Sequence, residues 1–267
     1  MQILIGCDPE VFVSKGGQLV SGYGLIPGTK KKPFPVKDGA VQVDGMALEF
    51  NTNPASTSEE FRYNINSVLN QLRQMVPEHD LLIESVARFG ADFIKKQPKK
   101  AVELGCDPDF NAYTNSANPR PNGKVDYRTA AGHIHIGWTS GEDSKSYDHM
   151  EKCQAVAMQL DVLLGVPSVL FDDGSERRKL YGAVGCFRPK SYGVEYRVLS
   201  NRWLHSGNLI NFVYAMAVKG VEMLMAGNPI FLKYTDTQEV INTSHKERAI
   251  EIVNEVEELK EWKHVLG

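Results

Sequence analysis

Residues 131–138, with the sequence AGHIHIGW, alternate small or polar side chains with large apolar ones. In a β-strand successive side chains point to opposite faces, so His133 and His135 share one face and the apolar residues between them share the other. The apolar face predicts that this strand packs on a hydrophobic core. The flanking glycines leave room for another backbone or a ligand beside the two imidazoles. We therefore expect this strand to form one wall of a site built on a sheet.

Three further strand-like segments, at about residues 8–13, 41–51 and 194–200, place a charged side chain on one face and apolar ones on the other. A single strand carboxylate most often faces water. If these strands are neighbours of the histidine strand, however, their carboxylates repel one another and need a cation. The candidate ligands are the carboxylates of Glu10, Glu49 and Glu195 and the imidazoles of His133 and His135. A set without thiolate suits Mg²⁺ or Mn²⁺ better than structural zinc.

A densely charged, glycine-rich segment, residues 171–189, precedes the last of these strands and is expected to be flexible. Guanidinium groups hold phosphate oxygens through forked hydrogen bonds, so arginines beside a metal site predict a nucleoside triphosphate such as ATP. The basic residues expected to contact it are Arg177, Arg178, Arg188, Lys190 and Arg197. Because the sequence contains neither a P-loop nor a GxGxxG fingerprint, metal and side chains would hold the phosphates.

The remaining pattern predicts a single domain, residues 1–267, of mixed strands and helices. Hydroxyl residues followed by glutamate start a helix near residue 56, and Asp44-Gly45 is expected to be the turn of a hairpin. A second helix is predicted over residues 148–164, ended by Gly165 and Pro167. Beyond about residue 207 only helices are expected, packed on the rest. The chain is long enough, and at 42% hydrophobic residues apolar enough, for one substantial core.

The charge and cysteine content narrow the possible partners. The net charge of −3 supplies no general positive field, so we expect neither nucleic acid nor an anionic membrane as partner. The four cysteines form no CxxC pair and are expected to be reduced thiols. With no signal-like start and no uninterrupted apolar run of about 18 residues, a cytoplasmic protein is expected. An oligomer is compatible with this sequence.

Several motifs, taken together and in order, resemble the phage-type carboxylate-amine ligases, the amidoligase type 2 family. They are GCDPE at 6–10, DGMALEFN at 44–51, GHIHIG at 132–137, RKLYG at 178–182, FRPK at 187–190 and YGVEYRVLSN at 192–201. The resemblance runs from about residue 4 to about residue 210 of the printed sequence. The family is related to glutamine synthetase and glutamate-cysteine ligase. This implies an α+β fold, a curved antiparallel sheet of about six strands flanked by helices.

The resemblance also implies roles for single residues. His133 would bind metal and His135 would touch the nucleotide, while Glu195 would bind metal and Arg197 phosphate. Glu10 and Glu49 would supply the remaining metal carboxylates. The ExE strand of glutamine synthetase is replaced here by Asp8-Pro9-Glu10, which leaves the role of Asp8 and the number of metal ions open.

The predicted reaction is ATP-dependent amide formation, in which a carboxylate attacks the γ-phosphate and an amine then displaces phosphate from the acyl phosphate. Arg188 and Arg197 would stabilise the transferred phosphoryl group. Asp109 and Glu103 are candidate general bases, with solvated loop carboxylates as the alternative. The expected substrates are small-molecule or peptide carboxylates and amines, in the host cytoplasm if the protein is phage-encoded.

Two other functions remain open at this stage. A metal-dependent hydrolase would use the same glutamates and histidines to activate water, although it has no need of the arginines. A non-catalytic nucleotide- or ligand-binding protein would merely pack the histidine strand.

Overall fold

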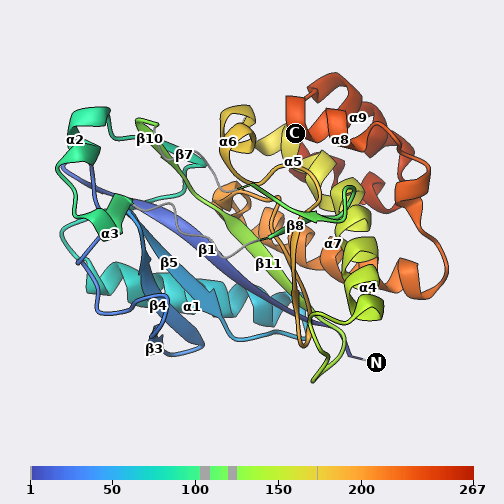
Figure 1. The fold of residues 1–267 in the computed structure, drawn as a ribbon, viewed down its shortest axis with the longest axis horizontal. Helices are drawn as coiled ribbons and strands as arrows, with labels where there is room; N and C mark the ends of the chain where they lie inside the picture. The colour runs from blue at the N-terminus through green and yellow to red at the C-terminus, as the bar shows by residue number, and fades with distance from the viewer. Residues whose placement is uncertain (1, 103–108, 120–124, 173) are drawn as a thin grey trace.

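The computed structural model describes residues 2–102, 109–119, 125–172 and 174–267. It is a mixed α/β fold with a large antiparallel sheet flanked by helices (Figure 1). Among the described residues this sheet has eleven strands. The expectation of about six strands was therefore wrong, because strands of only two or three residues extend the sheet at its edges. The expected glutamine synthetase-like form stays a prediction.

The longest strand, β1 (Leu4–Lys15), lies at the middle of the sheet. On one side it is followed by β5 (Ala47–Thr52), β4 (Gly39–Asp44) and β3 (Phe34–Val36). On the other side come β11 (Gly132–Gly137), β13 (Gly193–Tyr196), β12 (Cys186–Lys190), β8 (Phe110–Asn111) and β9 (Ser116–Ala117). The short strands β2 (Gln18–Val20) and β6 (Asp80–Leu82) pair with the C-terminal part of β1. A separate ribbon pairs β7 (Val86–Arg88) with β10 (Tyr127–Thr129).

Helices cover one face of the sheet. They are α1 (Ser58–Met75), the run formed by α4 (Tyr147–Leu160), the π-helical turn η1 (Asp161–Gly165) and α5 (Val166–Phe171), and α7 (Gly207–Met225). Ile5, Cys7, Val11 and Val13 alternate along β1 and are buried on this face. The other face of the central strands is therefore available for polar side chains.

The helix start predicted after residue 56 is confirmed. The Thr57 hydroxyl accepts a hydrogen bond from the Glu60 amide (3.1 Å), and the Glu60 carboxylate accepts one from the Ser56 amide (2.8 Å). These two bonds satisfy free amide groups at the start of α1, as in a capping box. The helix ends at Met75, just before Pro77.

The predicted end of the second long helix was wrong. The helical run does not stop at Gly165 but continues to Phe171. It does so through η1, in which the Val166 amide donates to the Asp161 carbonyl, and Pro167 then falls in the first turn of α5, where a missing amide proton costs little. The run has the length and hydropathy of a membrane span, but 78% of its most apolar window is buried inside the fold, as in a core helix.

The segment expected to be flexible contains regular secondary structure. Residues 171–189 contain the helix α6 (Ser175–Leu180) and most of strand β12. Arg177 is fully buried and Arg178 nearly so, which holds α6 against the body of the protein. The clustered charged residues of this segment therefore include buried arginines in α6 and Arg188 in the paired strand β12.

The β4–β5 hairpin turns one residue later than predicted. Asp44 pairs with Ala47, so the two turn residues are Gly45 and Met46, and Gly45 has φ +58°. Glycine at the first position of a two-residue turn is typical of a type II′ hairpin. As a result Asp44 is the last residue of strand β4, with its side chain on the same face as Gln42.

Shorter helices complete the described part of the chain. They are α2 (Ala91–Lys95), α3 (Lys99–Val102), η2 (Asn201–His205), η3 (Ile230–Leu232), α8 (Thr237–Thr243), α9 (Lys246–Glu255), η4 (Glu257–Trp262) and α10 (Lys263–Leu266). As expected, the residues beyond 207 are helical. They pack on the rest through contacts of α9 with α5 and of α10 with α7. The principal hydrophobic cluster runs from Ile5 to Leu266.

Candidate active site

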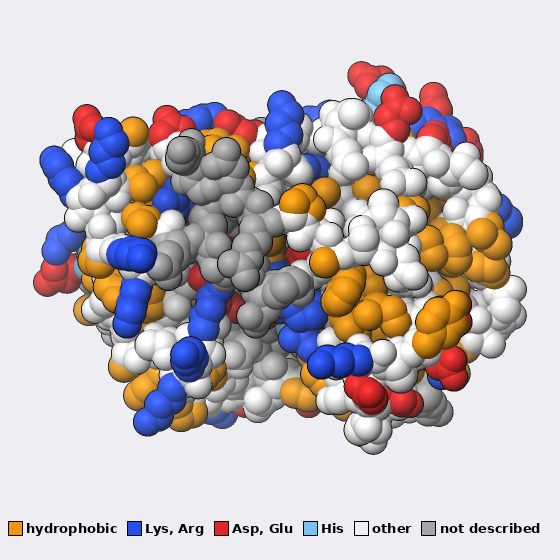
Figure 2. Space-filling view, viewed as in Figure 1, with side chains coloured by type: hydrophobic (Ala, Val, Ile, Leu, Met, Phe, Trp, Pro, Cys, Tyr) orange, Lys and Arg blue, Asp and Glu red, His pale blue; other side chains and the backbone are white. Residues whose placement is uncertain are grey.

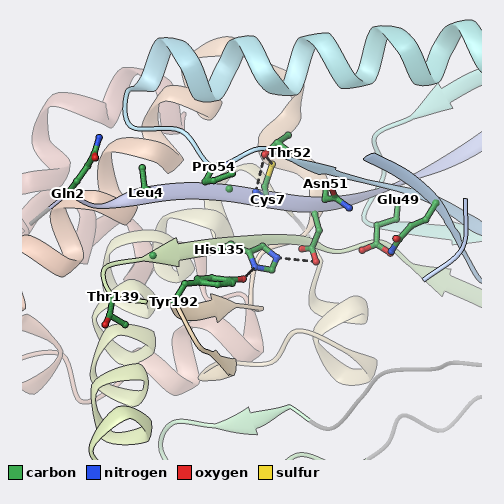
Figure 3. A pocket seen from close by; sticks show the side chains of 14 residues that line it. Gln2, Leu4, Cys7, Glu49, Asn51, Thr52, Pro54, His135, Thr139 and Tyr192 are labelled. Atoms are coloured by element: carbon green, nitrogen blue, oxygen red, sulfur yellow. Dashed lines mark hydrogen bonds and ion pairs between the residues drawn. The ribbon is translucent and has the colours of Figure 1, made fainter. Parts of the chain in front are cut away.

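Five neighbouring strands bring the candidate residues onto one face of the sheet. In the order β5, β1, β11, β13 and β12, Glu49 lies opposite Glu10, His135 opposite Glu195, and Glu195 opposite Arg188. Figure 3 shows Glu49 and His135 projecting away from helix α1, which lies on the other side of the sheet. The expected neighbourhood of the histidine strand and the three carboxylate strands is thus observed.

At the middle of this face, Asp8 lies between both histidines. Its Oδ2 is 3.1 Å from His135 Nε2, and its Oδ1 is 3.3 Å from His133 Nδ1. His133 Nδ1 is also 3.5 Å from Glu195 Oε1. One ligand atom each from Asp8, His135 and Glu195 lie within 4.8 Å of one another. We name these four residues, Asp8, His133, His135 and Glu195, the central cluster.

The central cluster fits a divalent cation. Asp8 Oδ1 is buried and has no hydrogen-bond partner among the described residues, since His133 approaches it without hydrogen-bond geometry. A buried carboxylate oxygen without a donor is costly and suits a metal ligand. The donors are carboxylate oxygen and imidazole nitrogen, as Mg²⁺ or Mn²⁺ accepts.

The two histidines differ in protonation. Burial, helped by Arg197, lowers the pKa of His133 to about 4, so its ring is neutral at pH 7 and can act as a ligand. Burial alone would also lower the pKa of His135, but the Asp8 carboxylate raises it above its ordinary value. The same imidazoles hold the pKa of Asp8 well below its usual range, against the effect of burial. Both shifts favour an ion pair between Asp8 and His135, beside an uncharged His133.

Three cations surround Glu195, which is itself fully buried. Lys190 Nζ lies 2.7 Å from its Oε2, Arg188 donates to both carboxylate oxygens at 3.2 and 3.3 Å, and Arg197 donates to Oε1. Three cations thus gather around one shared carboxylate on the β12–β13 side of the face, which we call the basic side.

Arg197 is the hub of the basic side. Its Nε donates to Asp109 Oδ2 (3.2 Å), one terminal nitrogen donates to the Tyr181 hydroxyl, and that hydroxyl is 3.3 Å from His133 Nε2. The structure thus places Asp109, one candidate general base, as an ion-pair partner of Arg197, with Asn118 donating to its other oxygen. Tyr181 links the guanidinium to the neutral histidine.

On the opposite side, Glu10, Asp44 and Glu49 bring one carboxylate oxygen each within 4.8 Å of one another. Lys30 Nζ lies 2.6 Å from Asp44 Oδ2, and Gln42 donates to Glu49 at 2.7 Å. Burial, with the nearby Asp44 charge, raises the pKa of Glu10 to about 8, and burial with Asp8 raises the pKa of Glu49 well above its usual range. We call these three carboxylates the acidic side.

A cavity of about 530 Å³ opens beside the central cluster (Figure 3). Its polar walls come from Asp8, Glu49 and His135, and apolar walls from Leu4 and Pro54. Tyr192 closes one edge, with its hydroxyl hydrogen-bonded to His135 Nδ1. This size is typical of small-molecule sites.

On this surface (Figure 2), Lys and Arg side chains gather on both sides of the centre. Figure 2 shows blue Lys and Arg side chains around the centre of the face and along its lower left, next to recessed red carboxylates.

Two predicted nucleotide contacts lie elsewhere. Arg177 is fully buried and donates to the carbonyls of Ala130, Val198 and Leu199, so it fastens the chain just before β11 to the chain just after β13. Arg178 is bonded to Ser244 and Ser168. Both guanidinium groups hold the protein together at these positions and do not face the central cluster.

Sequence reasoning missed Asp44, Tyr181 and Tyr192 and left Asp8 undecided. Asp44 was taken as a turn residue, and only the shifted hairpin register reveals its direction. The spacing of Asp8 and Glu10 on one strand face was a usable signal for Asp8. The two tyrosines lie within the motifs RKLYG and YGVEYRVLSN, but their role was not recognised because long-range packing brings them to the histidines. Glu103, residues 105–108, which repeat the GCDP of residues 6–9, and residues 120–124 lie outside the described residues.

A sequence model of the family described as phage phiEco32-like COOH·NH2 ligase-type 2 matches residues 124–263. The chain belongs to this family. The match includes β11, β12 and β13, and so His133, His135, Glu195 and the basic side, whereas β1, β4 and β5 precede it. The family description is that of a carboxylate-amine ligase. No curated protein is a significant match.

Proposed function

We propose that this member of the COOH·NH2 ligase family is an ATP- and Mg²⁺-dependent carboxylate-amine ligase that forms an amide bond through an acyl phosphate. The observation that carries this proposal is the placement of Lys190, Arg188 and Arg197 around Glu195, directly beside Asp8 and the histidines. Cations next to a carboxylate–imidazole cluster are the arrangement that phosphoryl transfer requires.

The central cluster would hold Mg²⁺ through Asp8, Glu195 and a histidine, and the ion would neutralise phosphate oxygens of ATP. Arg188, Lys190 and Arg197 would then exchange their contacts with Glu195 for contacts with phosphate. The neutral ring of His133 can serve as a ligand, and His135, whose pKa is raised, can donate a hydrogen bond to a phosphate oxygen. The nucleoside would lie in the cavity edged by Tyr192 and His135.

The acidic side would receive a positively charged partner of the reaction. Lys30 already shows that an alkylammonium group fits against Asp44. Attack of the substrate carboxylate on the γ-phosphorus releases ADP and forms the acyl phosphate. The amine, after losing a proton, then attacks the carbonyl carbon, and phosphate leaves. Anionic groups on the basic side and the amine on the acidic side approach each other across the central cluster.

The test is a screen of the purified protein with Mg-ATP against paired carboxylates, amino acids and polyamines, with ADP release as the signal and mass spectrometry of the product. We expect ADP release to rise only when carboxylate and amine are both present. A Glu78→Gln variant, changed at an exposed position, serves as matched control for Glu195→Gln. The ligase proposal is lost if carboxylate and amine together never increase ADP release. A hydrolase would act without ATP, and a binding protein would bind ATP without turnover.

We also propose that substrates are small-molecule or peptide carboxylates and amines, with neither nucleic acid nor membrane as a partner, and that the protein acts in the cytoplasm. The sheet face presents a recessed site of mixed charge, which fits small polar substrates.

A further inference from the structure

Asp161 is a carboxyl group with no part in the proposed reaction, and it is fully buried in the core between the sheet and the long helical run. Its Oδ1 accepts a hydrogen bond from the Tyr196 hydroxyl at 2.7 Å, and Tyr196 is also fully buried. Burying a carboxyl group in such surroundings is costly, and apolar residues of similar size usually stabilise a core at least as well. Stability alone therefore does not explain why Asp161 and Tyr196 are buried together.

The local backbone is shaped around this contact. Asp161 begins η1, the π-helical turn within the run from Tyr147 to Phe171. At the end of the turn, a Cβ atom on Gly165 would lie 2.8 Å from the Tyr196 hydroxyl oxygen. The wider turn and the missing side chain thus make room for the tyrosine. Single π-helical turns within α-helices occur frequently at functional sites.

Tyr196 is the neighbour of two residues of the candidate site. Along β13, Tyr196 faces the core while Glu195 faces the site, and Arg197 follows on the site face. A shift of Tyr196 along or away from the core would move the side chains of Glu195 and Arg197 as well. The three residues follow one another in the same extended backbone. No other hydrogen bond of the Tyr196 side chain to described residues is observed.

We propose that Asp161 and Tyr196 are positioning residues for the ligase site, whose hydrogen bond fixes the depth of β13 and so places Glu195 in the central cluster. The inference rests on the proposed function for its meaning in catalysis, but its geometry concerns only the metal-binding face. Partners that orient metal ligands commonly change metal affinity or activity when they are removed.

The experiment compares Mn²⁺ affinity of the full-length wild type with that of Tyr196→Phe and Asp161→Leu/Tyr196→Phe, measured without ATP. We expect both variants to bind Mn²⁺ about tenfold more weakly. The half-saturating Mg²⁺ concentration for ADP release should rise by a similar factor, while KM for ATP at saturating Mg²⁺ stays unchanged. Tyr214→Phe removes a hydroxyl from another buried tyrosine, which packs on Phe61, and should leave all three quantities unchanged.

The double variant separates positioning from stability, because it replaces the polar pair by an apolar one. Melting temperatures are measured in parallel. If the double variant folds as stably as the wild type and still binds Mn²⁺ weakly, the pair positions the site. Wild-type Mn²⁺ affinity in the double variant would overturn the proposal. If the wild type shows no ligase activity but the Mn²⁺ difference persists, the proposed function fails while the positioning role remains.

Discussion

The acidic and basic sides of the site face lie on the same sheet but differ in composition. On the acidic side, three carboxyl groups of the described residues face Lys30, which lies at Asp44. The pKa values of Glu10 and Glu49 are raised, so these two carry their full charge only when a cation lies beside them. On the basic side, two carboxylates of the described residues, Glu195 and Asp109, face three cations. The two sides lie on strands of one sheet, separated by β1 and β11. The difference teaches that strand order sorts acidic and basic side chains to opposite sides of the central cluster.

The largest expected effect is at Glu195. Replacement by Gln keeps the shape but removes the carboxylate that Lys190, Arg188 and Arg197 share, and it removes a proposed metal ligand. We expect ADP release to fall by about a thousandfold, as when one main electrostatic group is removed from an active site. Glu49→Gln, on the acidic side, should be less harmful. An equal loss in the two variants would mean that the sides are not specialised.

A carboxyl group on the core face, Asp161, should behave unlike those on the site face. Burial raises its pKa to about 7, in spite of the hydrogen bond from Tyr196. The folded state therefore holds its proton more tightly than the unfolded chain. This contribution to stability is full at pH values below the unfolded pKa of 3.8 and is lost as pH rises through about 7.

The Asp161 contribution can be measured by urea unfolding from pH 4 to pH 8. The difference between the wild type and Asp161→Asn should change by up to about 4 kcal/mol over this range, with the wild type relatively weaker at high pH. Tyr113 and Cys186 also lie near Asp161, but their pKa values are raised and they stay protonated there. A pH-independent difference would contradict the assignment.

The two histidines lie between the acidic and basic sides, and we expect their substitutions to have different effects. His133 is neutral and His135 is paired with Asp8, so His133→Ala should weaken Mn²⁺ binding more than His135→Ala, by about tenfold. His135→Ala should mainly raise KM for ATP. Isothermal titration with Mn²⁺ and with a non-hydrolysable ATP analogue separates the two. Equal Mn²⁺ affinity in both variants would remove the distinction.

The smallest expected effect is at Lys30. Lys30→Met removes the cation that lies against Asp44, so a divalent cation or an alkylamine should bind the acidic side more tightly, by less than about tenfold because Lys30 is partly exposed. The measurement is the amine concentration that gives half-maximal ADP release. Lys15→Met, at an exposed pair with Glu78, is the matched control. Weaker amine binding in Lys30→Met would show that the lysine assists the substrate.

Much of the face could be predicted from local pattern. Alternation along a strand places His133 with His135, and Glu195 with Arg197, whatever the rest of the fold does. Helix α1 was likewise predictable from its capping residues, and the sheet and its flanking helices from the strand and helix signals. The family motifs in β11, β12 and β13 lie within the region that the family match covers.

Other features depended on contacts between distant residues. From the sequence, Arg177 and Arg188 had the same predicted role as phosphate contacts. In the structure, Arg177 donates to backbone carbonyls next to the ends of β11 and β13, whereas Arg188 donates to Glu195. The β4–β5 turn begins one residue later than predicted, so Asp44 lies in strand β4 with its side chain close to Glu10. A π-helical turn carried the core helix past Pro167 and placed Asp161 against Tyr196.

The sequence by itself determined which side chains share a strand face, because that depends only on the two-residue repeat of the backbone. The tertiary structure alone decided which strands are neighbours, and hence that acidic and basic residues are sorted to opposite sides of Asp8 and the histidines. Strand order is set by the packing of the whole core, which no short segment contains.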